Sequence, residues 1–362
     1  MGKEVRVTEA EQIIKLDAEA AIALAAGTLE GAGVPADDAR LVGRCLVRAD
    51  LRGVDTHGIV RVPAYLNRIE RGLVDPAPKL EFEQTAPAAA RLDGRNGLGF
   101  VVASRAVAHA IELAHTNGLG LVGVRNSTHY GMAATYLLQA IEAGYAAMIF
   151  TNASPAIPPW GGRKDMFGTS PFAVGIPAPG SIPFVLDMSP TVVARGKIRK
   201  AAREGRPIPE GWALDPEGRP TIDPDAVLAG GSLLPIGGAK GAGLSMMLDI
   251  LCGVLTGARF GGEVGDQYKR FDRPQGVGHF ILLLRSDLFL QAEEVAARMA
   301  ELARRVKSNP RTEGVEEIFF PGEIEGRREA ERLAAGIPYR KRDLAPLAEA
   351  ARAADVAVPE GL

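Results

Sequence analysis

The first part of the chain repeats apolar residues at the three- and four-residue spacing of amphipathic helices. This periodicity predicts helices over residues 16–29, 36–51 and 59–71. Pro35 separates the first two helices, because proline cannot continue a helix, and the third ends near Gly72. We therefore expect a largely helical N-terminal region.

From about residue 81 the pattern changes to short apolar runs separated by helices and by turns rich in glycine and proline. Strands are predicted at residues 90–92, 119–124, 146–150, 172–176, 184–186 and 278–284. The last strand precedes a charged amphipathic helix over about 288–306. Strands that alternate with helices indicate an α/β centre, and 362 residues leave room for two domains.

The longest apolar stretch, residues 242–258, contains 17 residues and includes Asp249. A membrane-spanning helix needs about 20 apolar residues, so we expect this segment to be a buried helix and the protein to have no membrane span.

The charges near the N-terminus and the number of cysteines indicate the cellular compartment of the protein. Glu4, Glu9 and Glu11 precede the first apolar run, which is the wrong charge order for a secretory signal. Cys45 and Cys252 are the only cysteines, and neither has a neighbour at the spacing of a zinc ribbon or a redox motif. These features favour a cytoplasmic protein.

The charge balance excludes some partners. The chain has 42 basic and 44 acidic residues and a formal net charge of -2. Binding to nucleic acid or to an anionic membrane usually requires a basic surface. The expected partner is therefore a small molecule.

One motif has to be set aside. Gly118, Gly120 and Gly123 match the dinucleotide fingerprint G-x-G-x-x-G. That fingerprint must follow a strand and open a helix, whereas these glycines follow a predicted helix and lie in a predicted strand. We interpret the match as structural.

Two of the five histidines lie in polar segments flanked by glycine: His57 in DTHG and His129 in NSTHYG. Imidazole, with an ordinary pKa of ~6.5, suits a proton donor at neutral pH. The alternative is that the neighbouring hydroxyl and carboxylate side chains only cap helices. Two such segments in one chain favour a catalytic role.

Arg61 and Tyr65 follow His57 at spacings of four, which places them on one face of the predicted helix. A guanidinium beside a phenol suits a substrate carboxylate, because arginine can bind it through two hydrogen bonds. An exposed arginine next to a half-buried tyrosine is the structural alternative.

Three further candidates follow predicted strands or precede a helix. Ser154 lies in the loop 151–155, and Asp187 is the first polar residue after a buried run. Open α/β sheets bind ligands at such strand ends. Lys240 lies in the glycine-rich segment 237–243 before a helix, where backbone N–H groups can bind a phosphate. An ordinary helix cap at Asp187 and a flexible turn at Lys240 remain alternatives.

Two other functional classes remain as alternatives to this interpretation. The sequence has no glycosidase-like carboxylate pair, no H-E-x-x-H motif and no G-x-S-x-G motif. A metal-dependent hydrolase with His57, His129 and Asp187 as ligands is one alternative, and a non-catalytic protein that binds a nucleotide or an acid is another.

Five segments, in order from about residue 50 to 258, together resemble the type 2 malate/L-lactate dehydrogenase family. Its members include L-sulfolactate dehydrogenase, ureidoglycolate dehydrogenase, 2,3-diketogulonate reductase and Δ1-piperideine-2-carboxylate reductase. The segments are DLRGVDTHGIVRVPAYLNRIERG, RNSTHYGMAATYLLQAIEAGYAAMIFTNASPAIPPWGGR, FGTSPFAVGIPA, PFVLDMSPTVVARGKI and GGAKGAGLSMMLDILCGVLTGA.

The resemblance implies a mixed α/β, non-Rossmann NAD(P)-binding fold of the L-sulfolactate dehydrogenase-like type. It implies NAD or NADP as the cofactor and a homodimer. The α/β cofactor domain is expected over residues 81–289. A largely helical second domain is expected over residues 1–80 plus 290–362, formed by both chain ends.

The resemblance also implies residue roles. The histidine matching His129 transfers the proton in some members, and a Ser-His pair with the aspartate matching Asp187 does so in others. Thr56 stands where that pair has serine, which keeps a hydroxyl group. Arg61, Tyr65 and Ser154 match the substrate side. The cofactor side matches Thr169, Asp187, Met188, Ser189, Lys240, Pro321, Gly322 and Glu323.

The predicted function is hydride transfer between a nicotinamide and a small 2-oxo acid/2-hydroxy acid pair. An NADPH-dependent reductase of the cyclic imines Δ1-piperideine-2-carboxylate or Δ1-pyrroline-2-carboxylate is the alternative. His57 is the first choice of proton donor, because Arg61 lies one turn away, and His129 is the second.

Overall fold

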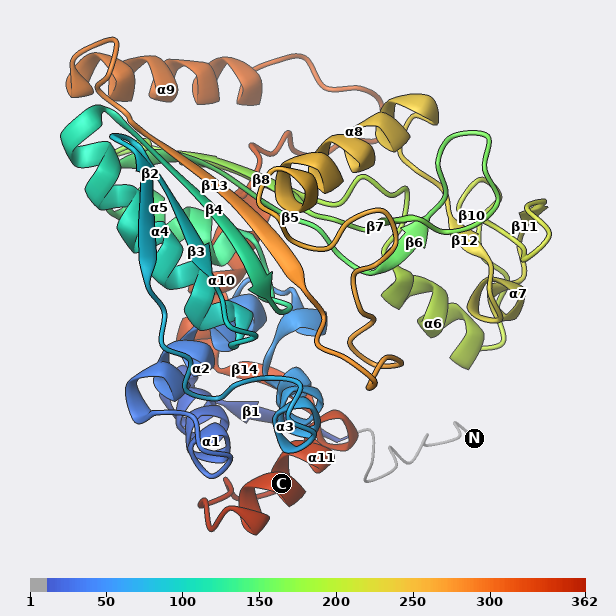
Figure 1. The fold of residues 1–362 in the computed structure, drawn as a ribbon. Coiled ribbons are helices and arrows are strands. Elements are labelled where there is room, and N and C mark those ends of the chain that lie inside the picture. Colours follow the sequence, from blue (N-terminus) through green and yellow to red (C-terminus); the bar gives the residue numbers. More distant parts are fainter. Residues whose placement is uncertain (1–11) are drawn as a thin grey trace, which may run out of the picture.

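The computed structural model describes residues 12–362 and contains a mixed seven-stranded sheet (Figure 1). The strands, in spatial order, are β2 (Phe82–Ala86), β3 (Ala89–Asp93), β4 (Leu119–Ser127), β13 (Val277–Arg285), β5 (Tyr145–Thr151), β8 (Phe172–Ile176) and β9 (Phe184–Met188). Only β3 and β4 pair in parallel, and the other neighbours are antiparallel. The sheet confirms the mixed α/β class and contains all six predicted strands. Glu4, Glu9 and Glu11 lie outside the described residues.

Helices α4 (Gly99–Asn117) and α5 (Ala134–Glu142) supply the buried side chains that pack against the sheet. Gly118, with φ at 83°, ends α4 in the left-handed region, and β4 starts directly afterwards. A Cβ on Gly120 would lie 2.0 Å from the Ala110 carbonyl oxygen. These glycines let a helix and a strand pack closely, as predicted, and do not form a dinucleotide loop.

A second core is built from both ends of the chain. Strand β1 (Ile13–Leu16) pairs with β14 (Ile337–Arg340), so the blue and red segments lie side by side below the sheet (Figure 1). Leu24, Leu46 and Leu344 are among its fully or nearly fully buried side chains. Its helices are α1 (Ala18–Glu30), α2 (Ala36–Leu51), α3 (Val62–Glu70) and α11 (Lys341–Ala353), with the 3-10 turns η2 (Asp55–His57) and η3 (Ile59–Arg61) before α3.

A small unit at the right of Figure 1 has its own core of Ile157, Ile198 and Leu233. The sequence pattern predicted none of its helices and strands. They are β6 (Pro155–Ile157), β7 (Phe167–Gly168), α6 (Arg195–Arg203), β10 (Ala213–Leu214), β11 (Pro220–Thr221), α7 (Pro224–Leu228) and β12 (Ser232–Leu233).

The expectation of a buried helix over residues 242–258 is wrong. The segment forms α8 (Ala239–Asp249) and a π-helical turn η4 (Ile250–Val254), and one apolar face of both is exposed. Helices α9 (Ala292–Lys307) and α10 (Glu323–Ala335) complete the described chain. Within residues 12–362 no helix is both long and apolar enough to cross a membrane.

Asp50, at the end of α2, ties the two chain ends to the loop that carries His57. Its Oδ2 accepts hydrogen bonds from the Ile59 backbone N–H at 3.0 Å and from the Tyr339 hydroxyl at 2.7 Å. A Cβ on Gly58 would lie 1.6 Å from Asp50 Oδ1, so only glycine fits there. Burial raises the pKa of Asp50 to about 7, although the two hydrogen bonds lower it.

We predict that Asp50 makes stability depend on pH. The folded chain holds this proton more tightly than an unfolded aspartic acid with a pKa of 3.8, so the free energy of unfolding falls as pH rises toward about 7. Asp50→Asn removes the titration and keeps one oxygen for both donors. The stability of the variant relative to wild type should increase by about 2 kcal/mol between pH 5 and 8, measured by urea unfolding.

Asp272→Asn is the control, because that side chain is 61% exposed. Its stability relative to wild type should change little over the same pH range. A pH dependence that is the same in Asp50→Asn and in wild type would show that Asp50 ionises normally in the folded chain.

Candidate active site

The two candidate histidines come together in space. His57 ends the turn η2 and His129 follows β4, and their rings stack with centroids 5.7 Å apart and an interplanar angle of 23°. The Thr128 hydroxyl accepts a hydrogen bond from the Gly99 N–H at 2.9 Å and donates one to the Gly97 carbonyl at 3.0 Å. Thr128 therefore hydrogen-bonds the first residue of α4. The same two hydrogen bonds fix the loop that carries His129.

Each ring has a hydroxyl group at its Nδ1 atom. The Tyr65 hydroxyl lies 2.9 Å from His129 Nδ1, and Thr56 Oγ1 lies 2.9 Å from His57 Nδ1. The His129 backbone N–H donates to Gln275 Oε1 at 3.2 Å. The two rings are thus oriented by residues from the chain-end core and from the loop before β13.

The surroundings keep both imidazoles neutral. Burial and, to a smaller extent, the positive charge of Arg61 together lower the pKa of His57 to about 4. Burial holds the pKa of His129 well below its ordinary value, and the charges of His57 and Arg61 act in the same direction. A neutral imidazole can accept a proton, so the pair is suited to act as a base.

A third histidine, His279, fixes the strand that leads to His129. His279 on β13 is fully buried, and its ring nitrogens lie 2.8 Å from the hydroxyls of Thr151 on β5 and Ser127 on β4. Its ring stacks on Tyr130 with centroids 4.8 Å apart. His279 fixes the end of β4, two residues before His129, and burial lowers its pKa to about 3.

Arg61 lies next to His57, as the spacing predicted. Its Nε donates to the Thr56 carbonyl at 2.5 Å, its NH1 group hydrogen-bonds the Tyr268 hydroxyl, and its guanidinium lies 5.1 Å from the centre of that ring. Sequence analysis missed Tyr268 and Gln275, because their segment between η4 and β13 has no periodic pattern.

Asp187 lies at the end of β9. Its Oδ2 accepts the Ala134 N–H at 2.8 Å at the start of α5, and burial raises its pKa to about 6. Among the described residues, no hydrogen bond joins Asp187 to His57 or His129. The geometry is that of a helix cap, and a role of Asp187 toward substrate or cofactor stays a prediction.

The residues expected on the cofactor side lie at both ends of β9, and Met188 and Ser189 are at its carboxyl end. The Pro321 carbonyl accepts the Val185 N–H at 3.0 Å, and Gly322 packs so tightly that an added Cβ would lie 2.6 Å from Val185 Cβ. Beyond the carboxyl end of β9, the Ile236 N–H donates to the Pro190 carbonyl at 2.9 Å, which brings the turn before Lys240 next to Ser189.

Three further candidates differ in their surroundings. Glu323 is buried, and its carboxylate pairs with Lys307 and Arg327, both at 2.6 Å. Ser154 and Thr169 are half-buried and come close together, because Pro155 pairs with Gly168 between β6 and β7.

The metal-hydrolase alternative finds no support in this geometry. Over residues 12–362, no three side chains of the histidine, cysteine, aspartate or glutamate type come close enough to share a metal ion.

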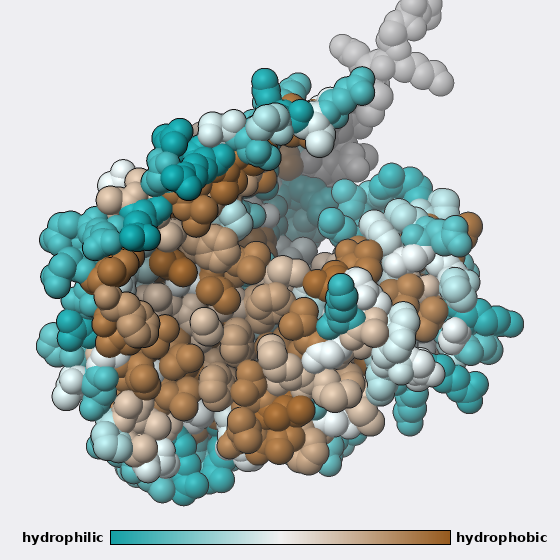
Figure 2. All heavy atoms as spheres, turned by 90° about the horizontal axis from the view of Figure 1, so that it is seen from above, coloured by the Kyte–Doolittle hydropathy of each residue, from teal (hydrophilic) through white to brown (hydrophobic). Residues whose placement is uncertain are grey.

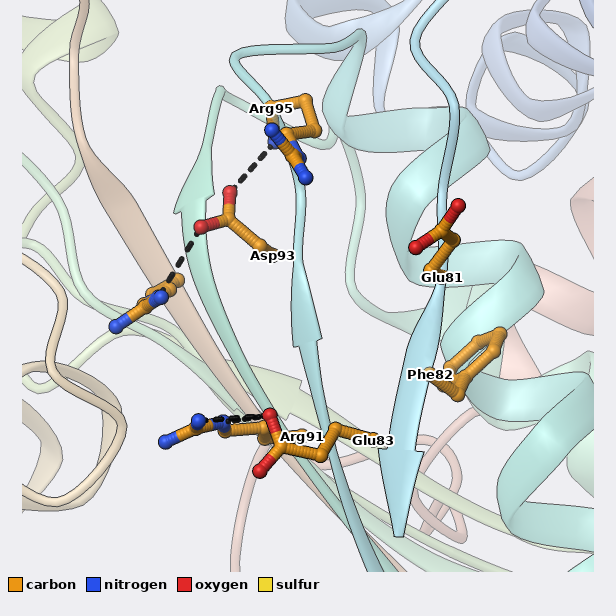
Figure 3. A pocket seen from close by; sticks show the side chains of 7 residues that line it. Glu81, Phe82, Glu83, Arg91, Asp93 and Arg95 are labelled. Carbon is orange, nitrogen blue, oxygen red and sulfur yellow. Dashed lines mark hydrogen bonds and ion pairs between the residues drawn. The ribbon is translucent and has the colours of Figure 1, made fainter.

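A separate pocket of about 230 Å³ lies at the β2–β3 edge of the sheet. Figure 3 shows its lining side chains, and the charged ones are largely paired: Arg91 with Glu83 at 2.7 Å and Arg125 with Asp93 at 3.2 Å. None of the candidate catalytic residues lines this pocket.

We predict that His57 and His129 remain neutral between about pH 6 and 8. Their imidazole nitrogen signals in NMR spectra should not titrate in this range, with assignments made from His57→Gln and His129→Gln. Arg61→Met should raise the pKa of His57, because it removes a positive charge that opposes protonation. Titration of either ring near 6.5 in wild type would contradict the lowering of both pKa values by burial and by Arg61.

Comparisons with known proteins identify the family of the chain. A family model described as malate/L-lactate dehydrogenase matches residues 16–348. Malate dehydrogenase of Pyrococcus abyssi (strain GE5 / Orsay) is 37% identical over 94% of this chain and 95% of its own length. The (2R)-3-sulfolactate dehydrogenase (NADP(+)) of Chromohalobacter salexigens is 42% identical over 72% of this chain and 77% of its own.

A solved structure matches as well. The sulfolactate dehydrogenase from Methanocaldococcus jannaschii has a TM-score of 0.89 and 34% identity, covering 95% of this chain and 98% of that one. On the family model, the relatives and the shared fold, the chain belongs to the malate/L-lactate dehydrogenase family.

Proposed function

We propose that this chain is an NAD(P)-dependent oxidoreductase that interconverts a small 2-hydroxy acid and the corresponding 2-oxo acid. The observation that carries the proposal is the stacked pair of His57 and His129 rings, 5.7 Å apart, beside Arg61. The relatives named as malate and sulfolactate dehydrogenases support the same reaction class.

Arg61 binds the substrate carboxylate in this proposal. No carboxylate among the described residues lies within 4 Å of its guanidinium, and its NH2 group has no protein acceptor there. Guanidinium and carboxylate form strong paired hydrogen bonds, so a bound acid places its C2 atom near the histidines.

A histidine moves the proton. As a neutral base it takes the hydroxyl proton when the 2-hydroxy acid is oxidised, and it returns that proton when the 2-oxo acid is reduced. His57 is our first assignment, because Arg61 lies beside it and Thr56 Oγ1 orients its ring. His129, oriented by Tyr65, is the second.

The donor groups near β9 fit a dinucleotide diphosphate. Lys240 is exposed in the first turn of α8, and no carboxylate in the described chain lies within 4 Å of it. The Ser170 hydroxyl, next to Thr169, is buried without a hydrogen-bond partner among those residues. With the diphosphate held by these groups, the nicotinamide of the bound cofactor would supply or accept the hydride at the substrate. The name of the sulfolactate relative, which specifies NADP(+), supports this cofactor class.

We predict that the protein oxidises NADH or NADPH with at least one acid of a panel that contains pyruvate, oxaloacetate, sulfopyruvate and 2,3-diketogulonate. The assay follows nicotinamide absorbance. His57→Gln should lower kcat by ~10²- to 10⁴-fold, because the proton acceptor is lost, whereas Arg61→Met should mainly raise KM.

Two outcomes would change this assignment. A large loss of kcat in His129→Gln, with His57→Gln close to wild type, would exchange the roles of the histidines. Turnover of Δ1-piperideine-2-carboxylate or Δ1-pyrroline-2-carboxylate, with all keto acids inactive, would favour the cyclic imine reductase.

We also propose that the chain forms a homodimer through the exposed apolar face of α8 and η4. Figure 2 shows apolar side chains gathered on this side of the molecule, which is the upper side in Figure 1. Met246, Ile250, Val254 and Leu255 are between 44% and 66% exposed. Large continuous apolar patches mark interfaces in soluble proteins, and a second copy is the partner that is always available.

We predict a dimeric mass for the wild-type protein in light scattering. The double variant Ile250→Glu with Leu255→Glu should be monomeric, because the interface would bury unpaired charges. The control is Ile13→Glu, since Ile13 is 55% exposed on β1 at the opposite end of the molecule (Figure 1). A monomeric wild type, or a double variant that stays dimeric, would contradict this interface.

The proposed location is the cytoplasm. Cys45 and Cys252 are both buried and not disulfide-bonded, as expected for a protein in a reducing compartment.

A further inference from the structure

Helix α10 packs beside α2 and reaches the turn that carries His57. It starts at Glu323, directly after Gly322, and the close contact of Gly322 with Val185 fixes this end of the helix against β9. The 13 residues of α10 span about 20 Å. One helix therefore runs from β9 to the turn that begins at Asp55.

Ion pairs rather than apolar contacts hold α10 in place. Of its residues only Glu323 is buried, and Leu333 is 60% exposed. Arg52 of α2, which is 5% exposed, donates to Glu329 Oε2 at 2.7 Å and to the Gly322 carbonyl at 3.3 Å. Hydrogen bonds from a planar guanidinium fix direction as well as distance. The position of α10 relative to α2 is therefore defined.

Arg332, in the last turn of α10, contacts the segment between α2 and His57. Its NH1 group donates to the Asp50 backbone carbonyl and to Asp55 Oδ1. The Arg332 side chain is 14% exposed, whereas that of Asp55 is 59% exposed. Exposed ion pairs contribute little, largely because two long side chains must be ordered. Here the Asp50 carbonyl already orders the arginine, so binding Asp55 costs less side-chain entropy.

Asp50 holds the same segment from its other side. Its carboxylate accepts the Ile59 backbone N–H at 3.0 Å, and its backbone carbonyl accepts the Arg332 guanidinium. Residues 51–58 thus form a loop whose ends are joined through Asp50. The middle of this loop is joined to α10 through Asp55.

A displacement of Asp55 would reach the candidate catalytic groups through one residue, Thr56. Thr56 Oγ1 lies 2.9 Å from His57 Nδ1, and the Thr56 carbonyl accepts the Arg61 Nε. In the described part of the chain Arg332 donates to neither imidazole of the histidine pair. Any effect of Arg332 on the site therefore passes through the backbone of this turn.

We propose that Arg332 is a positioning residue of the active site, which holds the turn with His57 and Arg61 in place through Asp55. This inference rests on the proposed function and adds a residue that acts through the turn rather than on the substrate. The helix that carries Arg332 starts beside β9, so it also fixes the turn relative to the candidate cofactor side.

The test measures steady-state kinetics with the acid of the panel that the wild type reduces fastest. Arg332→Met should lower kcat by about 10-fold and change the KM of NADH or NADPH by less than about twofold. Misplacing a proton-transfer group affects the chemical step more than it affects cofactor binding. Arg332→Lys should recover part of the loss, because a lysine can still donate a charged hydrogen bond to Asp55.

A double-mutant cycle shows whether Arg332 acts through Asp55. Asp55→Ala should lower kcat about as much as Arg332→Met, and the double variant should lose no more than the weaker single variant, whereas independent effects would multiply. Arg40→Met is the matched control. Arg40 of α2 pairs with Glu19 of α1 at 2.7 Å in the same core, with 52% and 71% of the two side chains exposed, and its loss should leave kcat unchanged.

Three results would overturn the proposal. The first is a wild-type kcat in Arg332→Met, and the second is a pair of losses that multiply in the double variant. The third is a fall in kcat that equals the loss of folded protein, measured by circular dichroism in the assay buffer, because that result would give Arg332 a purely structural role.

Failure of the proposed function has a different signature, since the wild type would then reduce none of the acids with either cofactor. NMR spectra of the imidazole nitrogens still test the positioning role in that case. The His57 signals should shift in Arg332→Met and stay in place in Arg40→Met, while those of the buried His279 stay in place in both variants. Unshifted His57 signals in Arg332→Met would overturn the proposal.

Discussion

The hydrogen bond between the Tyr65 hydroxyl and His129 joins the two large cores of the molecule at the candidate active site. Tyr65 belongs to the core built from the chain ends, and His129 follows a central strand of the sheet. Neither core alone contains both histidines, Arg61 and the residues that orient them. The site therefore exists only where the two cores meet, and it depends on their relative position.

The contact between the two cores also affects the pKa values of the two histidines. The surrounding protein partly shields His57 and His129 from solvent, and this burial is the largest cause of the low pKa of each ring. Arg61 adds a positive charge that an acid substrate would neutralise. Substrate binding would thus make it easier for the pair to carry a proton, so the site becomes proton-competent when the substrate is present.

The sequence predicted the periodic parts of the structure and the chemically distinctive residues. The helices of the N-terminal region, all six predicted strands and the closeness of Arg61 to His57 agree with the structure. The family resemblance is confirmed by the family model and the relatives. Sequence reasoning also rejected the GLGLVG motif correctly, because a helix precedes it and a strand contains it.

The remaining features depend on contacts that local patterns do not contain. The small unit around α6 has strands of only two or three residues, too short for a periodic signal. Tyr268 and Gln275 reach the site from an irregular loop held by Arg68. The expectation that residues 242–258 are buried was wrong because apolar composition alone does not distinguish a core helix from a helix with an exposed apolar face.

The pairing of β1 with β14 has a consequence for how the protein is made. These strands are separated by more than 300 residues, so their contacts raise the contact order of the chain-end core. During synthesis the sheet segments emerge before β14 and can begin to fold, whereas α1 and α2 must wait for residues near the end of the chain. Until then their apolar faces lack the partners that cover them in the folded protein, and the nascent chain exposes a surface that chaperones can bind.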